Sequence, residues 1–160
     1  MAEKVVSVLK EGDVAPEVQL QTDSGDWFTL SGLKGDTAVL YFYPRADTPG
    51  CTTEACEFRD SIERFPKHHA VIVGVSPDTP AAQAKFKAKY ALPFTLLADV
   101  DKKAAQAYGV WKEKTLYGKK SMGIVRSTFV IGPDGRIRKI FPKVRAAGHA
   151  AQVLEALVSL

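Results

Sequence analysis

The chain of 160 residues contains little cysteine, with Cys51 and Cys56 as its two thiols. Two cysteines are too few for a disulfide scaffold, so their use indicates a reducing compartment in which thiols are either catalytic or inert. Long apolar runs are missing too, because the longest, residues 38–43, is far shorter than the ~20 residues of a membrane helix. The first ten residues lack the basic region and apolar run of a signal peptide. We therefore expect a soluble protein without a membrane partner.

A concentrated charge of one sign is also absent. The net charge is +4, but the 22 basic residues are interleaved with 18 acidic ones along the whole sequence. No basic arm for nucleic acid is present, so we expect no nucleic-acid partner. The densest basic cluster, Lys112, Lys114, Lys119 and Lys120, predicts an irregular solvated loop, with contact to an anionic partner as the alternative.

The chain shows no internal repeat, low-complexity segment or linker, and its length predicts one domain over residues 1–160. Strands are expected at residues 18–20, 27–30, 38–43, 71–76, 94–97, 128–131 and 137–141, of which the first two and the last two form hairpins. Helices are expected from Pro49 onward, at 80–90, at 102–108 and at 149–158, the last burying Val153, Leu154, Leu157 and Val158. This order predicts an α/β fold, with a central mixed β-sheet, helices on both faces and an N-terminal β-hairpin.

Cys51 stands where an apolar strand gives way to a helix. Pro44 ends the strand, Thr48 is a good N-cap, and Pro49 suits the first helical position. Cys51 should therefore lie in the first turn, where unpaired N–H groups and the helix dipole favour a thiolate. Cys56 follows five residues later, so one nucleophilic sulfur has a second sulfur near it that can trap it as a disulfide.

The helix after Cys51 should bury one apolar stripe. Spacings of four, three, four and three residues join Cys51, Ala55, Phe58, Ile62 and Phe65. Cys51 is therefore expected to face inward. Cys56 is one residue past Ala55 and about 100° around the helix from it, so it should lie at the edge of the stripe or beyond.

The segment from Pro44 through Thr48 to Cys51 resembles the Pro-x-x-x-Thr-x-x-Cys signature of the peroxiredoxins. With Tyr41-Phe42-Tyr43 before it and Cys56 after it, it is similar to the bacterioferritin-comigratory (PrxQ) subfamily. The similarity extends from residue 12 to residue 131 and includes Arg126 at the start of a Ser-Thr-Phe strand. The resemblance implies a thioredoxin-like fold and a thiol peroxidase that needs no cofactor and no metal.

Each expected site residue has a role in that chemistry. Cys51 attacks the peroxide and becomes a sulfenic acid, which Cys56 converts into an intramolecular disulfide. Arg126 corresponds to the active-site arginine of the family and should hold both the thiolate and the peroxide oxygens. Thr48 is expected to add a hydroxyl hydrogen bond to the peroxide, and Pro44 to shield the site from water.

The implied activity is a thioredoxin-dependent, atypical 2-Cys peroxidase. Its substrates would be hydrogen peroxide and alkyl hydroperoxides, and its reductant thioredoxin or a glutaredoxin-like dithiol. We expect a cytoplasmic monomer, with the plastid stroma as the alternative location for a mature form. Two other functions remain open: a thiol–disulfide oxidoreductase, although such proteins normally use Cys-x-x-Cys, and a non-enzymatic chaperone or interaction module.

Five other residues have plainer interpretations. His68 and His69 should end the first long helix without binding metal, and His149 should be a capping or surface residue. Tyr108 and Trp111 are expected to pack in the core or at its rim.

Overall fold

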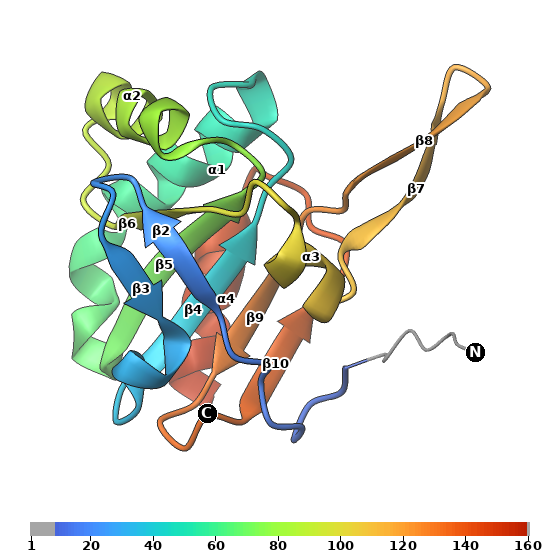
Figure 1. Cartoon of the computed structure of the whole chain (residues 1–160). Coiled ribbons are helices and arrows are strands. Elements are labelled where there is room, and N and C mark those ends of the chain that lie inside the picture. Colours follow the sequence, from blue (N-terminus) through green and yellow to red (C-terminus); the bar gives the residue numbers. More distant parts are fainter. Residues whose placement is uncertain (1–8, 160) are drawn as a thin grey trace.

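The computed structural model describes residues 9–159 and contains a central seven-stranded sheet with a separate two-stranded hairpin (Figure 1). The sheet order is β10-β9-β4-β5-β6-β2-β3. Its strands are β2 (Gln19–Thr22), β3 (Trp27–Thr29), β4 (Thr37–Phe42), β5 (Ala70–Ser76), β6 (Thr95–Ala98), β9 (Ser127–Ile131) and β10 (Ile137–Phe141). The sheet is mixed, because β4, β5 and β6 are parallel while the other pairings are antiparallel. The expectation that the first ten residues are not a signal peptide concerns mainly residues 1–8, which lie outside the described residues.

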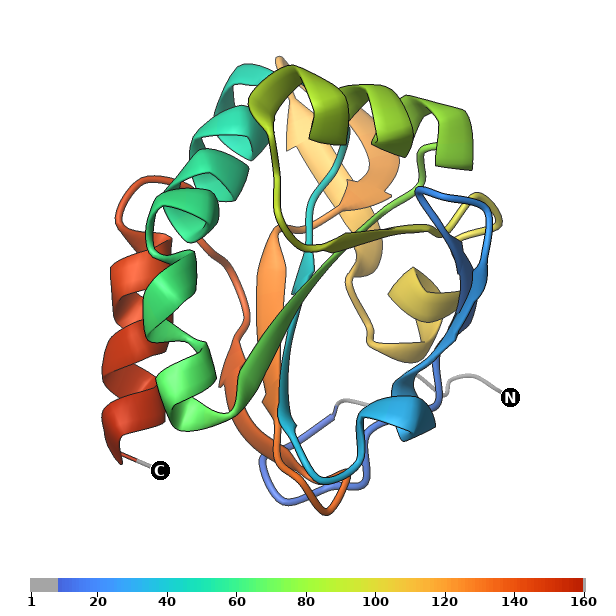
Figure 2. The same ribbon diagram turned by 90° about the vertical axis from the view of Figure 1, so that its left-hand side faces the viewer.

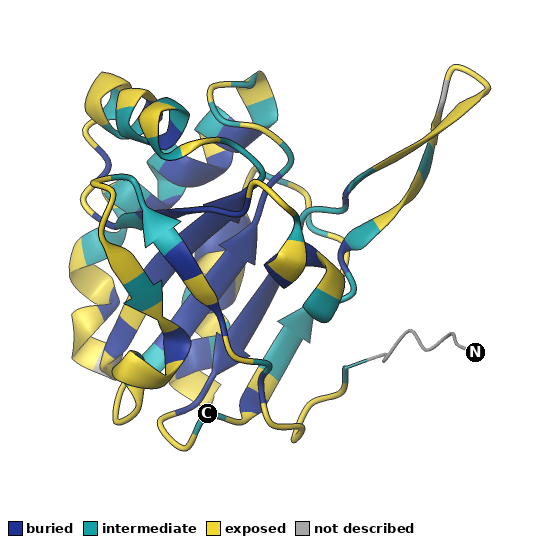
Figure 3. Cartoon of the chain, in the orientation of Figure 1, coloured by how far each residue is buried: buried dark blue, intermediate teal, exposed yellow. Residues whose placement is uncertain are grey.

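Residues of β4 alternate between two apolar cores. Ala38, Leu40 and Phe42 belong to one core, and Val39, Tyr41 and Tyr43 belong to the other. Successive side chains of a strand point to opposite faces, so this strand is buried on both sides. Figure 3 shows the buried strands at the centre of the molecule.

The helices cover both faces of the sheet, as the sequence predicts (Figure 2). They are α1 (Pro49–Asp60), α2 (Pro80–Tyr90), α3 (Lys103–Ala107) and α4 (His149–Ser159). Phe58, Phe86 and Val153 bring α1, α2 and α4 into the core that contains Tyr41. Helix α3 packs on the opposite face beside Tyr108, which is buried as expected, and Trp111 is partly buried at the rim.

Helix α1 is shorter than the sequence pattern suggests. It ends at Asp60, and the apolar stripe continues through two 3-10 turns, Ile62–Arg64 and Pro66–His68. His69 follows with a left-handed backbone, φ 55°. The expectation that the two histidines end a long α-helix is therefore wrong. Phe65 is fully buried all the same, because the tighter turns still direct it into the core.

Two expectations about the last helix are also wrong. Val158 is 70% exposed, whereas Val153 and Leu157 are buried. His149 is fully buried, and its Nε2 lies 2.7 Å from the hydroxyl of Thr128 on β9. Its ring stands edge-on to Phe58 and Phe141. A histidine at the start of a helix reads as a surface cap from sequence, but here the first turn of α4 lies against the sheet.

The basic segment after α3 forms strands, so the expectation of an irregular loop is wrong. Strands β7 (Trp111–Leu116) and β8 (Lys119–Ile124) pair over six residues each, and Tyr117 and Gly118 make the turn. Both turn residues have positive φ, 53° and 76°, the geometry of a two-residue hairpin. Within the described residues these strands pair only with each other, and the hairpin projects from the body of the molecule (Figure 1).

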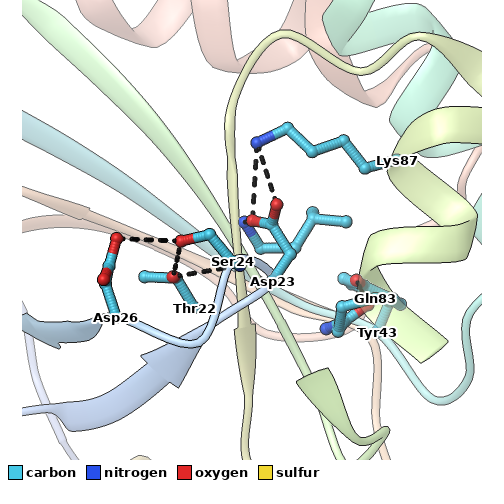
Figure 4. Close-up of polar contacts among 8 residues, drawn as sticks. Thr22, Asp23, Ser24, Asp26, Tyr43, Gln83 and Lys87 are labelled. Atoms are coloured by element: carbon cyan, nitrogen blue, oxygen red, sulfur yellow. Dashed lines mark hydrogen bonds and ion pairs between the residues drawn. The ribbon is translucent and has the colours of Figure 1, made fainter. Parts of the chain in front are cut away.

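Buried polar contacts fix the end of β4, next to the candidate site (Figure 4). The Tyr43 hydroxyl donates to Gln83 of α2 at 2.7 Å, and the Gln83 amide donates to the Leu97 carbonyl on β6. Nearby, the Asp23 carboxylate of the N-terminal hairpin pairs with Lys87 of α2 at 3.2 Å. These contacts hold α2 against the strand ends. Among the described residues, no helix has the length and apolar character needed to span a membrane.

Candidate active site

The loop that joins β4 to α1 is held on both sides. Asp78 accepts a hydrogen bond from the Ala46 backbone N–H at 2.7 Å. Asp47 has a left-handed backbone, φ 63°, and its carboxylate binds Lys89 at 2.9 Å and the Tyr90 hydroxyl at 2.8 Å. The hydrogen bond and charge of Lys89 lower the pKa of Asp47. Residues 44–48 are therefore positioned by the segment before α2 and by the end of α2 before the chain enters α1.

Thr48 occupies the N-cap position, but its side chain does not cap the helix. Its hydroxyl donates to the Arg45 carbonyl at 2.9 Å, which closes the turn through Asp47. The backbone carbonyl of Thr48 accepts the first helical bond, from Thr52 at 2.8 Å. The expected side-chain cap is therefore wrong. With its one proton engaged, the hydroxyl offers only lone pairs to a ligand.

Cys51 lies in the first turn of α1 and is 1% exposed. The Nη2 atom of Arg126 is 3.4 Å from its sulfur. Arg126 comes from the segment between β8 and β9, 75 positions away, and its carbonyl accepts a bond from the Val144 N–H. A guanidinium at this distance stabilises negative charge on the sulfur.

Glu54 shares the same guanidinium. Its Oε1 accepts a hydrogen bond from Arg126 Nη1 at 2.6 Å, and its side chain is fully buried. Burial raises the pKa of Glu54 to about 7, although the charge and hydrogen bond of Arg126 act to lower it. Burial alone would lower the pKa of Arg126, but Glu54 and Cys51 outweigh it and raise that pKa. Arg126 therefore stays charged between two acidic groups.

Two buried polar atoms of the site have no hydrogen-bond partner among the described residues. They are Oε2 of Glu54 and the hydroxyl of Tyr41. Burial raises the pKa of Tyr41 well above its usual value, and the neighbouring acidic groups, Glu54 and Cys51 among them, raise it further. A buried unsatisfied carboxylate oxygen favours the protonated form of the acid, consistent with the raised pKa of Glu54.

Gly50 makes room for the guanidinium. A β-carbon on this residue would lie 3.1 Å from Nη2 of Arg126, tighter than an ordinary contact. The absence of a side chain immediately before Cys51 therefore allows Arg126 to approach the start of the helix.

Cys56 lies on the same helix and is partly buried, as its place beside the apolar stripe predicts. Both cysteines carry free thiols. In a regular α-helix, residues five apart have Cα atoms roughly 8.6 Å from each other. A disulfide requires about 4.4–6.8 Å, so the two sulfurs cannot bond while α1 is intact.

Lys114 of β7 extends the positive charge of the site. Its side chain lies over Gly123 of β8, which is diagonal to it in the register: a β-carbon on Gly123 would lie 3.2 Å from Cδ and 3.7 Å from Nζ of Lys114. Burial and the charge of Arg126 lower the pKa of Lys114, whereas Cys51 raises it. The base of the projecting hairpin is therefore electrostatically coupled to the sulfur.

The geometry brings Cys51, Arg126 and Thr48 to one end of the sheet, and Pro44 opens the loop there as a partly buried residue. Sequence reasoning missed Glu54. A glutamate early in a helix is normally read as a solvated partner of the helix dipole. The available signal was its spacing, because Glu54 stands three residues after Cys51 and therefore on the same helical face.

A buried thiol faces a guanidinium that a buried carboxyl holds in place, so the guanidinium can stabilise negative charge on the sulfur and on atoms next to it. This chemistry suits attack by a thiolate on an electrophile that leaves as an anion. Within the described residues, no three His, Cys, Asp or Glu side chains gather in a way that would hold a metal ion.

Comparisons with known proteins point in the same direction. Residues 12–140 match the model of the AhpC/TSA family. The chain is 51% identical to peroxiredoxin Bcp of Bacillus subtilis over 146 residues, which cover 91% of this chain and 93% of that protein. It is 39% identical to peroxiredoxin Bcp of Escherichia coli, again over 146 residues, covering 91% and 94%.

Solved structures give the same result. A bacterioferritin comigratory protein of Xanthomonas campestris, studied for alkyl peroxide reduction, is 41% identical and superposes with a TM-score of 0.85 over 89% of this chain and 90% of that one. A cysteine-to-serine mutant of Xylella fastidiosa PrxQ is 37% identical and superposes with a TM-score of 0.89 over 96% and 98%. These likenesses confirm the thioredoxin-like fold that the sequence predicts.

Proposed function

The chain belongs to the AhpC/TSA family as a peroxiredoxin of the Bcp/PrxQ subfamily, and we propose that it reduces hydrogen peroxide and alkyl hydroperoxides with Cys51 as the nucleophile. Membership makes it a thiol peroxidase, an antioxidant oxidoreductase that uses a thiol reductant. The observation that carries the assignment of the nucleophile is the 3.4 Å contact between Cys51 Sγ and Arg126 Nη2 at the start of α1.

In the first step the Cys51 thiolate attacks one peroxide oxygen. The O–O bond breaks, Cys51 becomes a sulfenic acid, and the other oxygen leaves as hydroxide or alkoxide and takes up a proton. Arg126 stabilises the negative charge as it moves from sulfur to the leaving oxygen. Thr48 accepts a hydrogen bond from the peroxide O–H, because its own proton is held by the Arg45 carbonyl. Pro44 limits access of water to the sulfur.

Glu54 is a positioning residue in this scheme. It holds Nη1 of Arg126, which leaves Nη2 free to face Cys51. A planar guanidinium bound at one nitrogen can present the others in a fixed direction. This arrangement orients the charge before the peroxide binds, so little reorganisation is needed in the transition state.

In the second step the Cys56 thiol attacks the sulfenic sulfur. The S–O bond breaks, water leaves, and an intramolecular disulfide forms. Because both cysteines lie in α1, the first half of that helix must unwind before they meet. The disulfide needs no second chain, which supports a monomer. A dithiol such as thioredoxin then reduces it, and the cytoplasm supplies the reducing conditions for recycling.

A coupled assay tests this function and separates it from the alternatives. The purified protein is mixed with hydrogen peroxide or cumene hydroperoxide, thioredoxin, thioredoxin reductase and NADPH, and NADPH oxidation is followed. The proposal expects peroxide-dependent turnover that is lost in Cys51→Ser. Insulin reduction without peroxide would instead support an oxidoreductase, and neither activity would leave an interaction module.

A further inference from the structure

The hairpin of β7 and β8 is a projecting element with no partner among the described residues. Most of its residues are exposed: Tyr117 at the turn is 94% exposed and Met122 is 50% exposed. Two-stranded hairpins are marginally stable in isolation. Tyrosine and methionine are enriched in protein interfaces. An element of this kind is suited to contact with another protein.

Charge is divided unequally between the two faces of the hairpin. Lys112 lies opposite Gly123, and Lys119 lies opposite Leu116, so the register of the hairpin places Lys112, Lys114 and Lys119 on one face. We call this set the three-lysine face. The opposite face carries Lys120 together with Glu113, which offsets its charge. None of these lysines forms an ion pair with another described residue.

The three-lysine face is connected to the active site. Lys114 lies across Gly123, and its charge is coupled to those of Arg126 and Cys51. Strand β8 ends at Ile124, two residues before Arg126, and the Val125 N–H donates to the Val110 carbonyl at the base of the hairpin. A partner that binds this face is therefore held beside the start of α1.

From these observations we propose that the three-lysine face is the docking surface for the protein that reduces the Cys51–Cys56 disulfide, a dithiol reductant with an acidic surface around its reactive thiols. This inference rests on the proposed function and adds the recognition element of its recycling step. The reductant gives up two electrons and two protons and becomes a disulfide, while Cys51 and Cys56 return to thiols. Charge complementarity mainly increases the rate of encounter, which the recycling step needs.

The acidic partner is favoured over a second copy of this chain. The chain carries a net charge of +4, so two copies repel each other at long range. A reductant is the partner that the chemistry requires, because the disulfide forms in α1, and Cys51 of α1 contacts Arg126, which lies two residues after the hairpin.

Two adjacent lysines provide a matched test. Lys119→Glu reverses a charge on the three-lysine face, and Lys120→Glu makes the same change on the other face. The Cys51–Cys56 disulfide is prepared with diamide, so that the test does not depend on peroxide turnover. Its reduction by an acidic thioredoxin is then followed by stopped flow, in parallel with reduction by dithiothreitol, which has no protein surface.

At ~10 mM salt, where charges act over ~30 Å, Lys119→Glu should slow reduction by thioredoxin about 10-fold, a difference of about 1.4 kcal/mol in barrier. Lys120→Glu should slow it less than about 2-fold, and the rates should converge at ~1 M salt, where screening leaves ~3 Å. Reduction by dithiothreitol and oxidation by peroxide should match the wild type in both variants. Lys119→Gln should give an intermediate effect.

Four results would overturn the proposal. Equal thioredoxin rates for Lys119→Glu and the wild type would exclude docking on this face. Equal slowing by Lys120→Glu would show that only net charge matters. Slower reduction by dithiothreitol would mean that the hairpin controls exposure of the disulfide instead of docking. Binding of duplex DNA or anionic vesicles that Lys119→Glu abolishes, with an unchanged thioredoxin rate, would assign the face to another ligand. Loss of peroxide turnover with normal thioredoxin kinetics would contradict the proposed function alone.

Discussion

Cys51 and Glu54 lie one helical turn apart on α1 and contact the same guanidinium, at 3.4 Å from Nη2 and 2.6 Å from Nη1 of Arg126. Unwinding the start of α1 therefore breaks both contacts together. It also takes Glu54 out of the environment that raises its pKa to about 7. The chemistry of the sulfur, the position of the arginine and the protonation of a buried carboxyl are thus linked to one short helical segment.

The roles of the two cysteines predict different outcomes for their serine variants. Cys51→Ser should abolish peroxide reduction, because it removes the nucleophile. Cys56→Ser should still react once, since the first step needs only Cys51, and the sulfenic acid should then persist without a resolving thiol. Mass spectrometry after one equivalent of hydrogen peroxide distinguishes the two. A normal first turnover in Cys51→Ser would show that the nucleophile is assigned wrongly.

Arg126 should matter through its shape as well as its charge. Arg126→Lys keeps the positive charge but loses the planar fork that binds Cys51 and Glu54 together. Oxidation by peroxide should slow at least ~10-fold, which corresponds to about 1.4 kcal/mol. Stopped-flow oxidation rates measure this effect.

Gly50→Ala provides a milder control for Arg126. The new β-carbon would lie 3.1 Å from Nη2, so the guanidinium must shift by a few tenths of an ångström without being removed. Its rate should fall between those of Arg126→Lys and the wild type. Equal rates for all three proteins would count against a direct role for Arg126.

The buried carboxyl should leave a signature in the pH dependence of stability. The pKa of Glu54 is about 7 in the folded protein, against an ordinary value of 4.5. A raised pKa contributes stability that is present below the ordinary value and lost as pH rises through the folded value. The loss is on the order of 3 kcal/mol if the whole shift applies. Urea unfolding of the reduced protein at pH 5 and pH 8 measures the free energy of unfolding.

Glu54→Gln is the matched variant, since its side chain is close in shape and does not titrate. Its free energy of unfolding should decline less than that of the wild type between pH 5 and pH 8. A decline equal to that of the wild type would mean that the carboxyl is not protonated in the folded state near neutral pH.

His149 should change the free energy of unfolding with pH in the direction opposite to that of Glu54. Burial lowers its pKa, the hydrogen bond with Gln152 counteracts this, and the charge of Arg126 adds to the lowering. A histidine whose folded pKa is lowered contributes stability above its ordinary pKa of about 6.5 and loses it as pH falls below that value. Acid should therefore weaken the packing of α4 on Thr128 and Phe58.

Between pH 7 and pH 5, the free energy of unfolding of His149→Gln should fall less than that of the wild type. The variant should, however, be less stable than the wild type at pH 7. Chemical denaturation of the variant at those two pH values is the check. An equal fall in the free energy of unfolding for the variant and the wild type would assign the acid sensitivity to other groups.

Most of the fold follows from local patterns in the sequence. The apolar run of β4, the exact span of α2 and the late hairpin have strong signals of composition and turn chemistry, and each is confirmed. The hairpin of β7 and β8 was missed because lysine-rich segments have weak strand propensity, while the turn at Tyr117 and Gly118 carried the relevant signal. Tertiary packing determines the features that local patterns do not predict. One example is His149 at the start of α4, which is buried where it meets Thr128 of β9.

The site was predictable in part for the same reason. Cys51 and Thr48 lie within a few residues of each other, so capping and strand patterns locate them. The place of Arg126 beside Cys51 depends on contacts across 75 positions, and only the family resemblance indicated it. Sequence patterns also give no indication that unwinding the start of α1 breaks a contact of Glu54, whose side chain is fully buried against Arg126.

Other contacts define how far α1 can unwind. The carboxylate of Glu57 accepts a hydrogen bond from the Gly148 N–H at 2.8 Å, and Arg59 donates to the Tyr90 carbonyl at 2.7 Å. Phe58 packs between Tyr41 and Phe65. These anchors lie after Cys56, so the helix can open at its start while its second half stays in place.

Hydrogen exchange on reduced and oxidised protein tests this central claim most directly. The amides of residues 52–58 should lose protection only in the oxidised form, because their helical hydrogen bonds join them to carbonyls four residues earlier in the segment that unwinds, while those of β4 should keep theirs. Cys56→Ser treated with peroxide is the control, and it should retain protection because no disulfide forms. Unchanged protection of residues 52–58, in protein whose Cys51–Cys56 disulfide is confirmed by mass, would contradict the account.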